Sequence, residues 1–280
     1  MTNKDFILDL FNRLSKNDIY QGGYSEDKES IRKIFKNTKD NLKSDVLIRL
    51  TVIDSMYSTQ MDKRYYGLNE LAEVISSFSN LKDLAIKFAN NPEDTSCFDY
   101  KIGEKKGNLF DEKYGINKQG NKKGLAVSLI SKYLCFLTDF KFPIYDSIVL
   151  EIFPKLWAYC ELGEKECPKH ITYSASGSER IKTFVNAINT LIKELKLEKE
   201  NYKYDVLDRI MWFTGKVCRG NLSLILSYEE YVEFFGSKGK DYKFNIKEEE
   251  DLSKLPFLKG KETLNDIFKL AKEIQLMFNK

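Results

Sequence analysis

Apolar residues recur at a helical spacing along most of the chain. In the first turns Phe6, Ile7, Leu10 and Leu14 repeat every three or four positions, which is the pattern of one buried helix face. The same spacing predicts further helices over residues 45–57, 68–78, 81–88, 128–137, 147–156, 178–197, 205–217, 227–235 and 264–278. We therefore expect a mainly α-helical protein.

Two stretches depart from this pattern. Residues 90–123 lose the periodicity and are rich in Gly, Asn, Lys and Asp, so we expect mostly loop there. Residues 241–246 alternate and are the best candidate for a short strand. At the start of the second helix Asp45 precedes an apolar run, which makes it the expected N-cap residue.

Composition narrows the class of protein. The 280 residues are 42% hydrophobic and 31% charged, as in ordinary soluble domains. No apolar run approaches the roughly 18–20 residues that span a bilayer, the first residues carry no signal-peptide pattern, and five cysteines, an odd number, argue against a disulfide framework. We expect a cytoplasmic monomer without membrane contact.

The histidine count excludes several chemistries. His170 is the only histidine in the chain, so a zinc site with two or three imidazole ligands is impossible. A serine or cysteine hydrolase would need this one residue as its base, and nothing around it supports that role. Catalysis would therefore rest on carboxylates, lysines or hydroxyls.

Positive charge is concentrated in one region. The formal net charge is only +3, but residues 101–133 hold eight lysines against three acidic residues. This region contains glycines and leads into a predicted helix. It is either a solvated loop or a surface that contacts phosphates, and charge alone does not separate the two.

The helix over residues 128–137 carries a narrow polar stripe. Ser128, Ser131, Lys132 and Cys135 fall on one side of it, and this side either lines a cleft or faces solvent. Downstream, Pro143 fixes an extended approach to Asp146. Asp146 is a natural N-cap for the next helix, and its apolar neighbours also suit a desolvated catalytic carboxylate.

These residues resemble the helix-hairpin-helix DNA glycosylases, typified by endonuclease III and adenine DNA glycosylase. Members carry a hairpin G-V-G-x-x-T-A, a helix, and then F-P-[IV]-x-D-x-x-V with a catalytic aspartate. This chain has G-L-A-V-S-L-I at 124–130 and F-P-I-Y-D-S-I-V at 142–149. In members with a lysine nucleophile, the lysine precedes the aspartate by the 18 residues that separate Ser128 from Asp146 here.

The resemblance implies a fold and a set of roles. It implies two helical lobes around a cleft over residues 1–225, followed by an α or α+β extension over 226–280. Asp146 would be the catalytic carboxylate, and Ser128, at the lysine position, implies a monofunctional enzyme without a Schiff base. Lys132, one turn on, is a second catalytic candidate, and its other reading is a surface lysine.

Further positions would contact DNA under this resemblance. The hairpin would bind phosphates through Gly124, Lys122 and Lys123, although Ala126 replaces the second glycine and the usual leucine-proline lead-in is missing. Residues 55–60 resemble the family turn M-L-Q-Q-T-Q that enters the DNA, and Asp54 lies one position from the family's glutamate. The remaining candidates for contact with the base are Tyr57, Gln60, Tyr145 and Trp212.

No cofactor is expected. Family members often hold an iron–sulfur cluster with four cysteines, but here Cys160 and Cys167 are followed only by the distant Cys218. The resemblance thus predicts a DNA N-glycosylase that binds double-stranded DNA, flips one damaged or modified base and hydrolyses its glycosidic bond with an aspartate. A non-catalytic DNA-binding relative and a protein-interaction scaffold stay open as alternatives.

Overall fold

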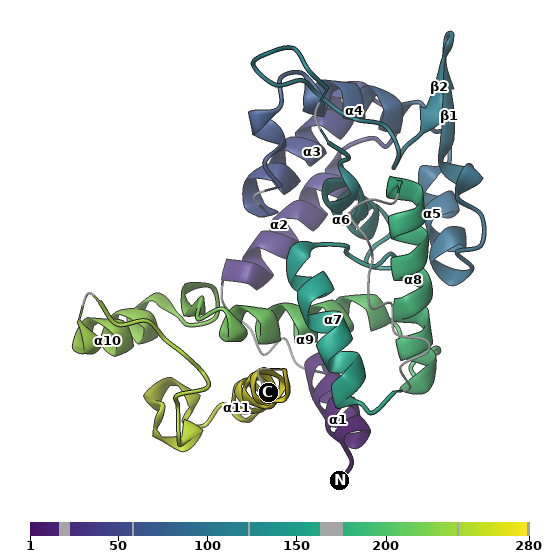
Figure 1. The fold of residues 1–280 in the computed structure, drawn as a ribbon. Coiled ribbons are helices and arrows are strands. Elements are labelled where there is room, and N and C mark those ends of the chain that lie inside the picture. The colour runs from purple at the N-terminus through teal and green to yellow at the C-terminus, as the bar shows by residue number, and fades with distance from the viewer. Residues whose placement is uncertain (17–22, 58, 123, 163–175, 240, 279–280) are drawn as a thin grey trace. The chain divides into compact units, whose positions relative to one another are not determined.

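The computed structural model describes the chain apart from residues 17–22, 58, 123, 163–175, 240 and 279–280 (Figure 1). The side chains of residues 23–27 and 62 are also outside the description. Helices dominate the described part, and its one sheet has two short strands. The predicted mainly α-helical class is confirmed.

The contacts divide the chain into two compact units. Unit 1 combines three segments, Met1–Glu26, Asp146–Cys167 and Asp205–Lys280. Its helices are α1 (Asn3–Lys16), α7 (Ser147–Tyr159), α9 (Lys203–Cys218, which starts two residues earlier), α10 (Tyr228–Lys238) and α11 (Glu262–Met277). Residues 226–280 thus belong to a unit that also contains α1 and α7, and the predicted division at residue 225 stays a prediction.

Unit 1 is held together by contacts between its distant segments. Arg13 on α1 forms an ion pair with Asp266 on α11 at 2.5 Å, and the Asn3 amide donates to the Tyr159 carbonyl at the end of α7. Helix α9 packs closely on α7 because Gly215 has no side chain. A Cβ there would lie 2.4 Å from the Ile148 side chain.

Unit 2 consists of Asp27–Tyr145 and Pro168–Tyr204. It contains the helices α2 (Gly23–Asn37), α3 (Lys43–Tyr57), α4 (Gly67–Ser76), α5 (Leu81–Asn90), α6 (Val127–Leu137) and α8 (Gly177–Glu194). The strands β1 (Asp99–Ile102) and β2 (Lys105–Asn108) form an antiparallel hairpin in which Asp99 faces Asn108. Helix α3 packs on both α4 and α6.

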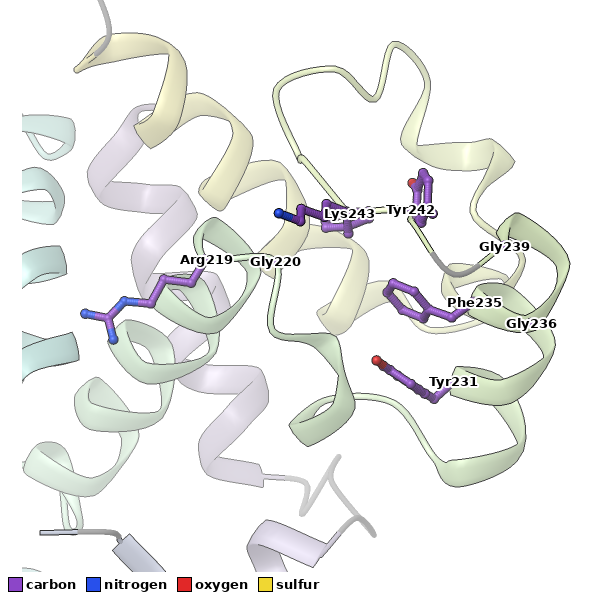
Figure 2. Close-up of a pocket in the computed structure, with 9 residues that line it drawn as sticks. Arg219, Gly220, Tyr231, Phe235, Gly236, Gly239, Tyr242 and Lys243 are labelled. Atoms are coloured by element: carbon purple, nitrogen blue, oxygen red, sulfur yellow. The ribbon is translucent and has the colours of Figure 1, made fainter. Parts of the chain in front are cut away.

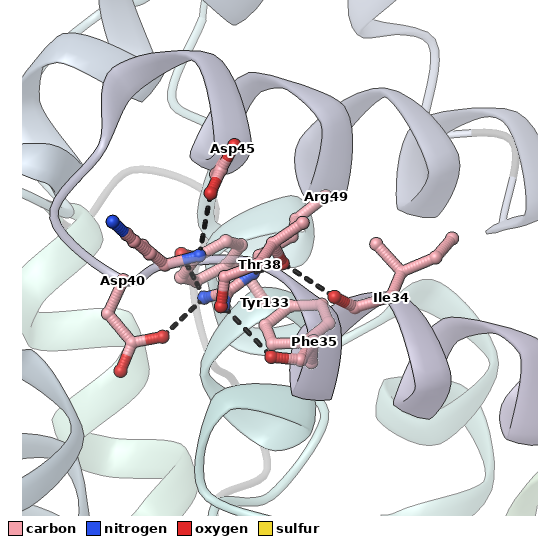
Figure 3. Close-up of polar contacts among 8 residues, drawn as sticks. Ile34, Phe35, Thr38, Asp40, Asp45, Arg49 and Tyr133 are labelled. Atoms are coloured by element: carbon pink, nitrogen blue, oxygen red, sulfur yellow. Dashed lines mark hydrogen bonds and ion pairs between the residues drawn. The ribbon is translucent and has the colours of Figure 1, made fainter.

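A buried arginine organises the junction of α2, α3 and α6 in unit 2 (Figure 3). Arg49 is fully buried. Its guanidinium donates to the Asp40 carboxylate at 2.6 Å and to the Thr38 carbonyl at 2.5 Å, and it lies 4.5 Å from the centre of the Phe35 ring. Its hydrogen bonds therefore join α3 to the chain at the end of α2.

The first turn of α8 packs on the loop that precedes α6. A Cβ on Gly177 would lie 1.9 Å from the Phe110 carbonyl oxygen, so only glycine fits. The Asp111 carboxylate accepts from the Ser178 backbone N–H at 2.8 Å and from its hydroxyl at 2.6 Å. Asp111 and the N-cap residue Ser176 together satisfy N–H groups that a helix start leaves open.

Two local expectations are corrected. Helix α3 begins at Lys43, so Asp45 lies in its first turn and accepts from the Lys39 backbone N–H at 2.7 Å (Figure 3). Residues 241–246 form no strand, because the side chains of Phe244 and Ile246 are buried without a neighbouring strand for the backbone. The loop that was expected within residues 90–123 is present over residues 109–122, which form turns and isolated bridges.

Candidate functional site

Asp146 is fixed at the start of α7, as expected for an N-cap residue. Its Oδ1 atom accepts from the backbone N–H groups of Ile148 at 3.0 Å and Val149 at 2.9 Å. Its backbone is extended, with φ −144° and ψ 173°, as is typical of this position. The side chain is half-buried. The predicted capping role is confirmed, and it gives this carboxylate one defined orientation.

The segment that leads to Asp146 is anchored in unit 2. Residues 142–145 are all buried. The Ser131 hydroxyl on α6 accepts from the Tyr145 backbone N–H at 3.0 Å, and the Tyr145 ring packs edge-on against Phe184 of α8 at 5.5 Å. Ser131 therefore holds the backbone directly before the aspartate, and Tyr145, predicted to contact a base, is a packed residue.

The polar stripe of α6 lies in the interior. Lys132 is only 3% exposed, and Ser131 and Cys135 are buried as well. The Lys132 ammonium lies 2.9 Å from the Ser128 hydroxyl and 5.5 Å from the centre of the Tyr57 ring. The readings of this stripe as a solvent face and of Lys132 as a surface lysine are wrong. The Lys132 ammonium, the Ser128 hydroxyl and the Tyr57 ring thus form one cluster on unit 2.

The turn after α3 is built around a buried carboxylate. Asp54 is 5% exposed, and it accepts from the Met61 backbone N–H at 2.9 Å and from the Thr59 hydroxyl. Between them Gln60 adopts a left-handed backbone with φ 61° and is exposed. For a residue other than glycine this conformation costs about 1–3 kcal/mol, so the turn presents Gln60 outward at some expense in stability.

The segment around Gly124, which the resemblance assigns to a phosphate-binding hairpin, is held by side chains that were not among the predicted site residues. Arg64 donates to the Gly124 carbonyl at 2.7 Å, and burial lowers the pKa of its guanidinium, which the charge of Asp54 opposes. Lys122 is paired with Glu70 at 3.1 Å, and Glu70 also accepts from the Gly115 backbone N–H. Lys123 lies outside the described residues.

Trp212 is buried on α9 in unit 1, at 9% exposure. The Lys216 ammonium lies 5.0 Å from the centre of its ring. Burial lowers the pKa of Lys216, and the negative charge of Asp146 opposes this shift. Trp212 is thus a core residue of unit 1, and its predicted contact with a base stays a prediction.

Other chemistries find little support in the described residues. His170 and Cys167 lie outside them. No group of three or more His, Cys, Asp or Glu side chains is arranged for a metal ion in the part of the chain that the structure covers. Burial raises the pKa of the Cys97 and Cys218 thiols to about 11 and that of Cys160 to about 12, which makes them poor nucleophiles.

The sequence analysis missed the residues that hold the backbone around the candidate site in place, namely Ser131, Arg64 and Glu70. Ser131 was visible as a member of the polar stripe, but its partner, the Tyr145 backbone, leaves no mark in a sequence. Arg64 and Glu70 act across separations of 60 and 45 residues, for which helical periodicity gives no signal.

No protein-family model, curated protein or solved structure matches this chain. Within the described ranges, no helix combines the length and the apolar character that a bilayer crossing requires.

Proposed function

We propose that this protein is a monofunctional DNA N-glycosylase in which Asp146 is the catalytic carboxylate. The observation that carries the proposal is the setting of this residue. It follows a buried segment anchored by Ser131, and two backbone N–H groups fix one of its oxygens. A carboxylate with one fixed orientation can stabilise positive charge in a transition state, because it needs little reorganisation when the reaction occurs.

The reaction needs only such a group and water. Cleavage of the bond between C1′ and the base nitrogen develops positive charge on the sugar, and the carboxylate of Asp146 stabilises this charge. A water oxygen then bonds to C1′ and gives a proton to the carboxylate, while the departing base takes a proton from solvent. The scarcity of histidine in the chain is compatible with this chemistry.

The cluster around Lys132 supplies groups for the extracted base. A flipped base is read through hydrogen bonds to its edge and by contact with aromatic rings. The Lys132 ammonium and the Ser128 hydroxyl offer donors, and the Tyr57 ring lies beside them. With a serine at the position of the family's nucleophile, we propose hydrolysis without a covalent intermediate.

We propose that exposed lysines and the turn that follows α3 bind the DNA. The exposed Gln60, with its left-handed backbone, is suited to fill the space that a flipped base vacates. Lys101, Lys105 and Lys106 are exposed on or beside the β1–β2 hairpin and would add salt-dependent contacts to phosphates. For Lys122 to bind a phosphate, its ion pair with Glu70 would have to break.

A DNA-binding protein without catalysis is the second candidate. Two observations favour it. Residues 99–122 form no helix, and Lys122 is already paired with Glu70, so the segment around Gly124 departs from the family's hairpin at its phosphate contacts. In this case Asp146 would serve only as the cap of α7.

The substitution Asp146→Asn separates the two candidates. Asparagine caps a helix about as well as aspartate, so α7 should persist while the negative charge is lost. Asp251→Asn is the matched control, because Asp251 also caps a helical turn of unit 1, through the Ser253 N–H at 3.0 Å. Both proteins would be incubated with duplexes that carry damaged and modified bases, and free base would be measured by mass spectrometry.

We expect the unmodified protein and Asp251→Asn to release a base and leave alkali-labile sites, and Asp146→Asn to lose at least about 100-fold of this activity. Binding to the same duplex should survive in all three. Duplex binding that Asp146→Asn leaves unchanged, with no base released from any duplex by the unmodified protein, would select the non-catalytic candidate.

A further inference from the structure

Unit 1 contains a pocket of about 650 Å³ that the proposed chemistry does not use (Figure 2). It lies where the end of α9 meets α10 and the chain that follows α10. Its lining consists of two cations, four aromatic residues and three glycines, namely Arg219, Lys243, Tyr231, Phe235, Tyr242, Phe244, Gly220, Gly236 and Gly239. The volume is in the usual range for small-molecule sites.

One wall of the pocket is a pair of stacked rings from α10. Tyr231 and Phe235 are one helical turn apart, with ring centres 4.4 Å apart and planes inclined by 25°. Tyr242 packs against Phe235 at 5.9 Å. All three rings are half-buried, so each keeps accessible surface. The wall presents aromatic faces on which a further flat ring can stack.

The wall is held in place by the core behind it. Phe234, the buried neighbour of Phe235, packs edge-on against Phe257 at 5.0 Å and against Tyr242 at 5.9 Å. The start of α10 is fixed by a capping box between Ser227 and Glu230. The rings therefore need little rearrangement to receive a ligand, which favours binding.

Positive charge lies on the side opposite the rings. Figure 2 shows the ends of the Arg219 and Lys243 side chains away from α10. Arg219 is paired with Glu151 at 2.5 Å. Lys243 is exposed and has no ion pair within the described residues. Glu249 also lies near the lining, since its carboxylate accepts from the Tyr242 hydroxyl at 3.0 Å.

We propose that this pocket binds a nucleotide, with its base stacked on the rings of Tyr231 and Phe235 and its phosphate next to Lys243 and Arg219. An uncharged flat ligand would leave the cations unused, and a simple anion would leave the rings unused. A nucleotide carries both a flat base and a phosphate. It reaches the pocket either free or as an unpaired residue of a nucleic-acid strand, and the site stands whether or not Asp146 cleaves a glycosidic bond.

Gly236 provides a clean way to block the pocket. It lines the cavity from α10, and a Cβ added there would meet no atom within 4 Å. The change Gly236→Leu therefore adds a side chain at the pocket wall without a clash at its Cβ, and Gly236→Ala is its matched control. Lys243→Gln removes the unpaired charge. Its control is Lys259→Gln, which removes an exposed charge from the same unit outside the lining.

Three probes would be titrated by calorimetry at physiological salt. They are adenosine monophosphate, adenosine, and a single-stranded octamer of deoxyadenylate. Base stacking is worth roughly 5- to 100-fold in affinity, so we expect Gly236→Leu to weaken binding at least about tenfold and Lys243→Gln at least about fivefold. Gly236→Ala and Lys259→Gln should change it less than about twofold. Saturable binding of the monophosphate identifies a free nucleotide as ligand, and binding of the octamer alone identifies a strand.

Three results would overturn the proposal of a nucleotide site. Equal binding of adenosine and its monophosphate would remove the phosphate contact and overturn the proposal. So would the absence of saturable binding by both nucleotide probes, or binding that Gly236→Leu leaves unchanged. Thermal unfolding of each variant verifies that the fold is intact.

Discussion

The Lys132 ammonium and the Ser128 hydroxyl lie 2.9 Å apart on consecutive turns of α6. Ser128 occupies the position at which the resembling family has a nucleophilic lysine. The lysine of this chain, Lys132, lies one turn further along and contacts Ser128. The ammonium is buried inside unit 2, and we propose that it donates to the extracted base.

Replacing Lys132 by methionine tests this proposal. Methionine preserves most of the volume and removes the charge, but it also leaves the partners of the buried ammonium without it, so some loss of stability is expected whatever the role of Lys132. We expect Lys132→Met to lower base release by about 100-fold or more at a temperature at which its urea titration shows the variant to be folded. Full activity of Lys132→Met would remove this residue from the proposed site.

Borohydride trapping distinguishes the two chemical roles of Lys132. A lysine nucleophile forms a Schiff base with the sugar, which borohydride reduces to a stable protein–DNA adduct. Because Ser128 occupies the nucleophile position, we expect no adduct with the unmodified protein. An adduct that Lys132→Met abolishes would instead assign Lys132 as the nucleophile.

Arg49 should be among the most sensitive positions for stability. Its fully buried guanidinium satisfies the carbonyl of Thr38 and pairs with Asp40. Arg49→Met removes these hydrogen bonds together with the buried contact to the Phe35 ring, and we expect a loss of about 3 kcal/mol or more in the free energy of unfolding. Asp40→Asn keeps an acceptor at a largely exposed position and should cost less than about 1 kcal/mol. Urea titrations of both variants measure the difference.

Two glycines with opposite surroundings give a matched pair. A Cβ on Gly177 would lie 1.9 Å from the Phe110 carbonyl oxygen, whereas one on Gly236 meets nothing within 4 Å. We expect Gly177→Ala to destabilise the protein by about 1–3 kcal/mol through overpacking. Gly236→Ala should stabilise α10 by up to about 1 kcal/mol. Equal unfolding midpoints for the two variants would contradict the close packing at the start of α8.

Thiol reactivity should rise only at strongly alkaline pH. Burial raises the pKa of Cys97 and Cys218 to about 11, so the folded thiols stay protonated and unreactive through neutral pH. In a Cys167→Ser background we expect alkylation by iodoacetamide to increase about tenfold per pH unit from pH 8 to pH 11. In urea the same thiols should react about two orders of magnitude faster at pH 8. A plateau near pH 9 in the folded protein would contradict the raised pKa values.

The helices could largely be predicted because each buries one apolar face. Residues 4–14 and 264–278 showed the pattern clearly and correspond to α1 and α11. Helix α2 was missed because its sequence is mostly polar. The β1–β2 hairpin was also missed, because its strands have four residues each and are rich in exposed lysine.

Those features of the candidate site could be predicted that depend only on residues close together in the sequence. The role of Asp146 as a cap depends on its own position and the two residues that follow, and this is visible in a sequence. Whether Lys132 faces solvent or the interior depends on packing from distant parts of the chain. The sequence therefore left both readings open, and the structure shows the buried one.

The ion pair between Arg13 and Asp266 also has a consequence for how the chain acquires its structure. The two residues are 253 positions apart, so α1 leaves the ribosome long before its partner α11. Until α7 and α11 have been made, the apolar side of α1 lacks the surfaces against which it packs in unit 1. Unit 2, whose first segment is continuous from Asp27 to Tyr145, can begin to fold while unit 1 must wait for its final helix, and a chain lacking α11 would leave α1 exposed to proteases.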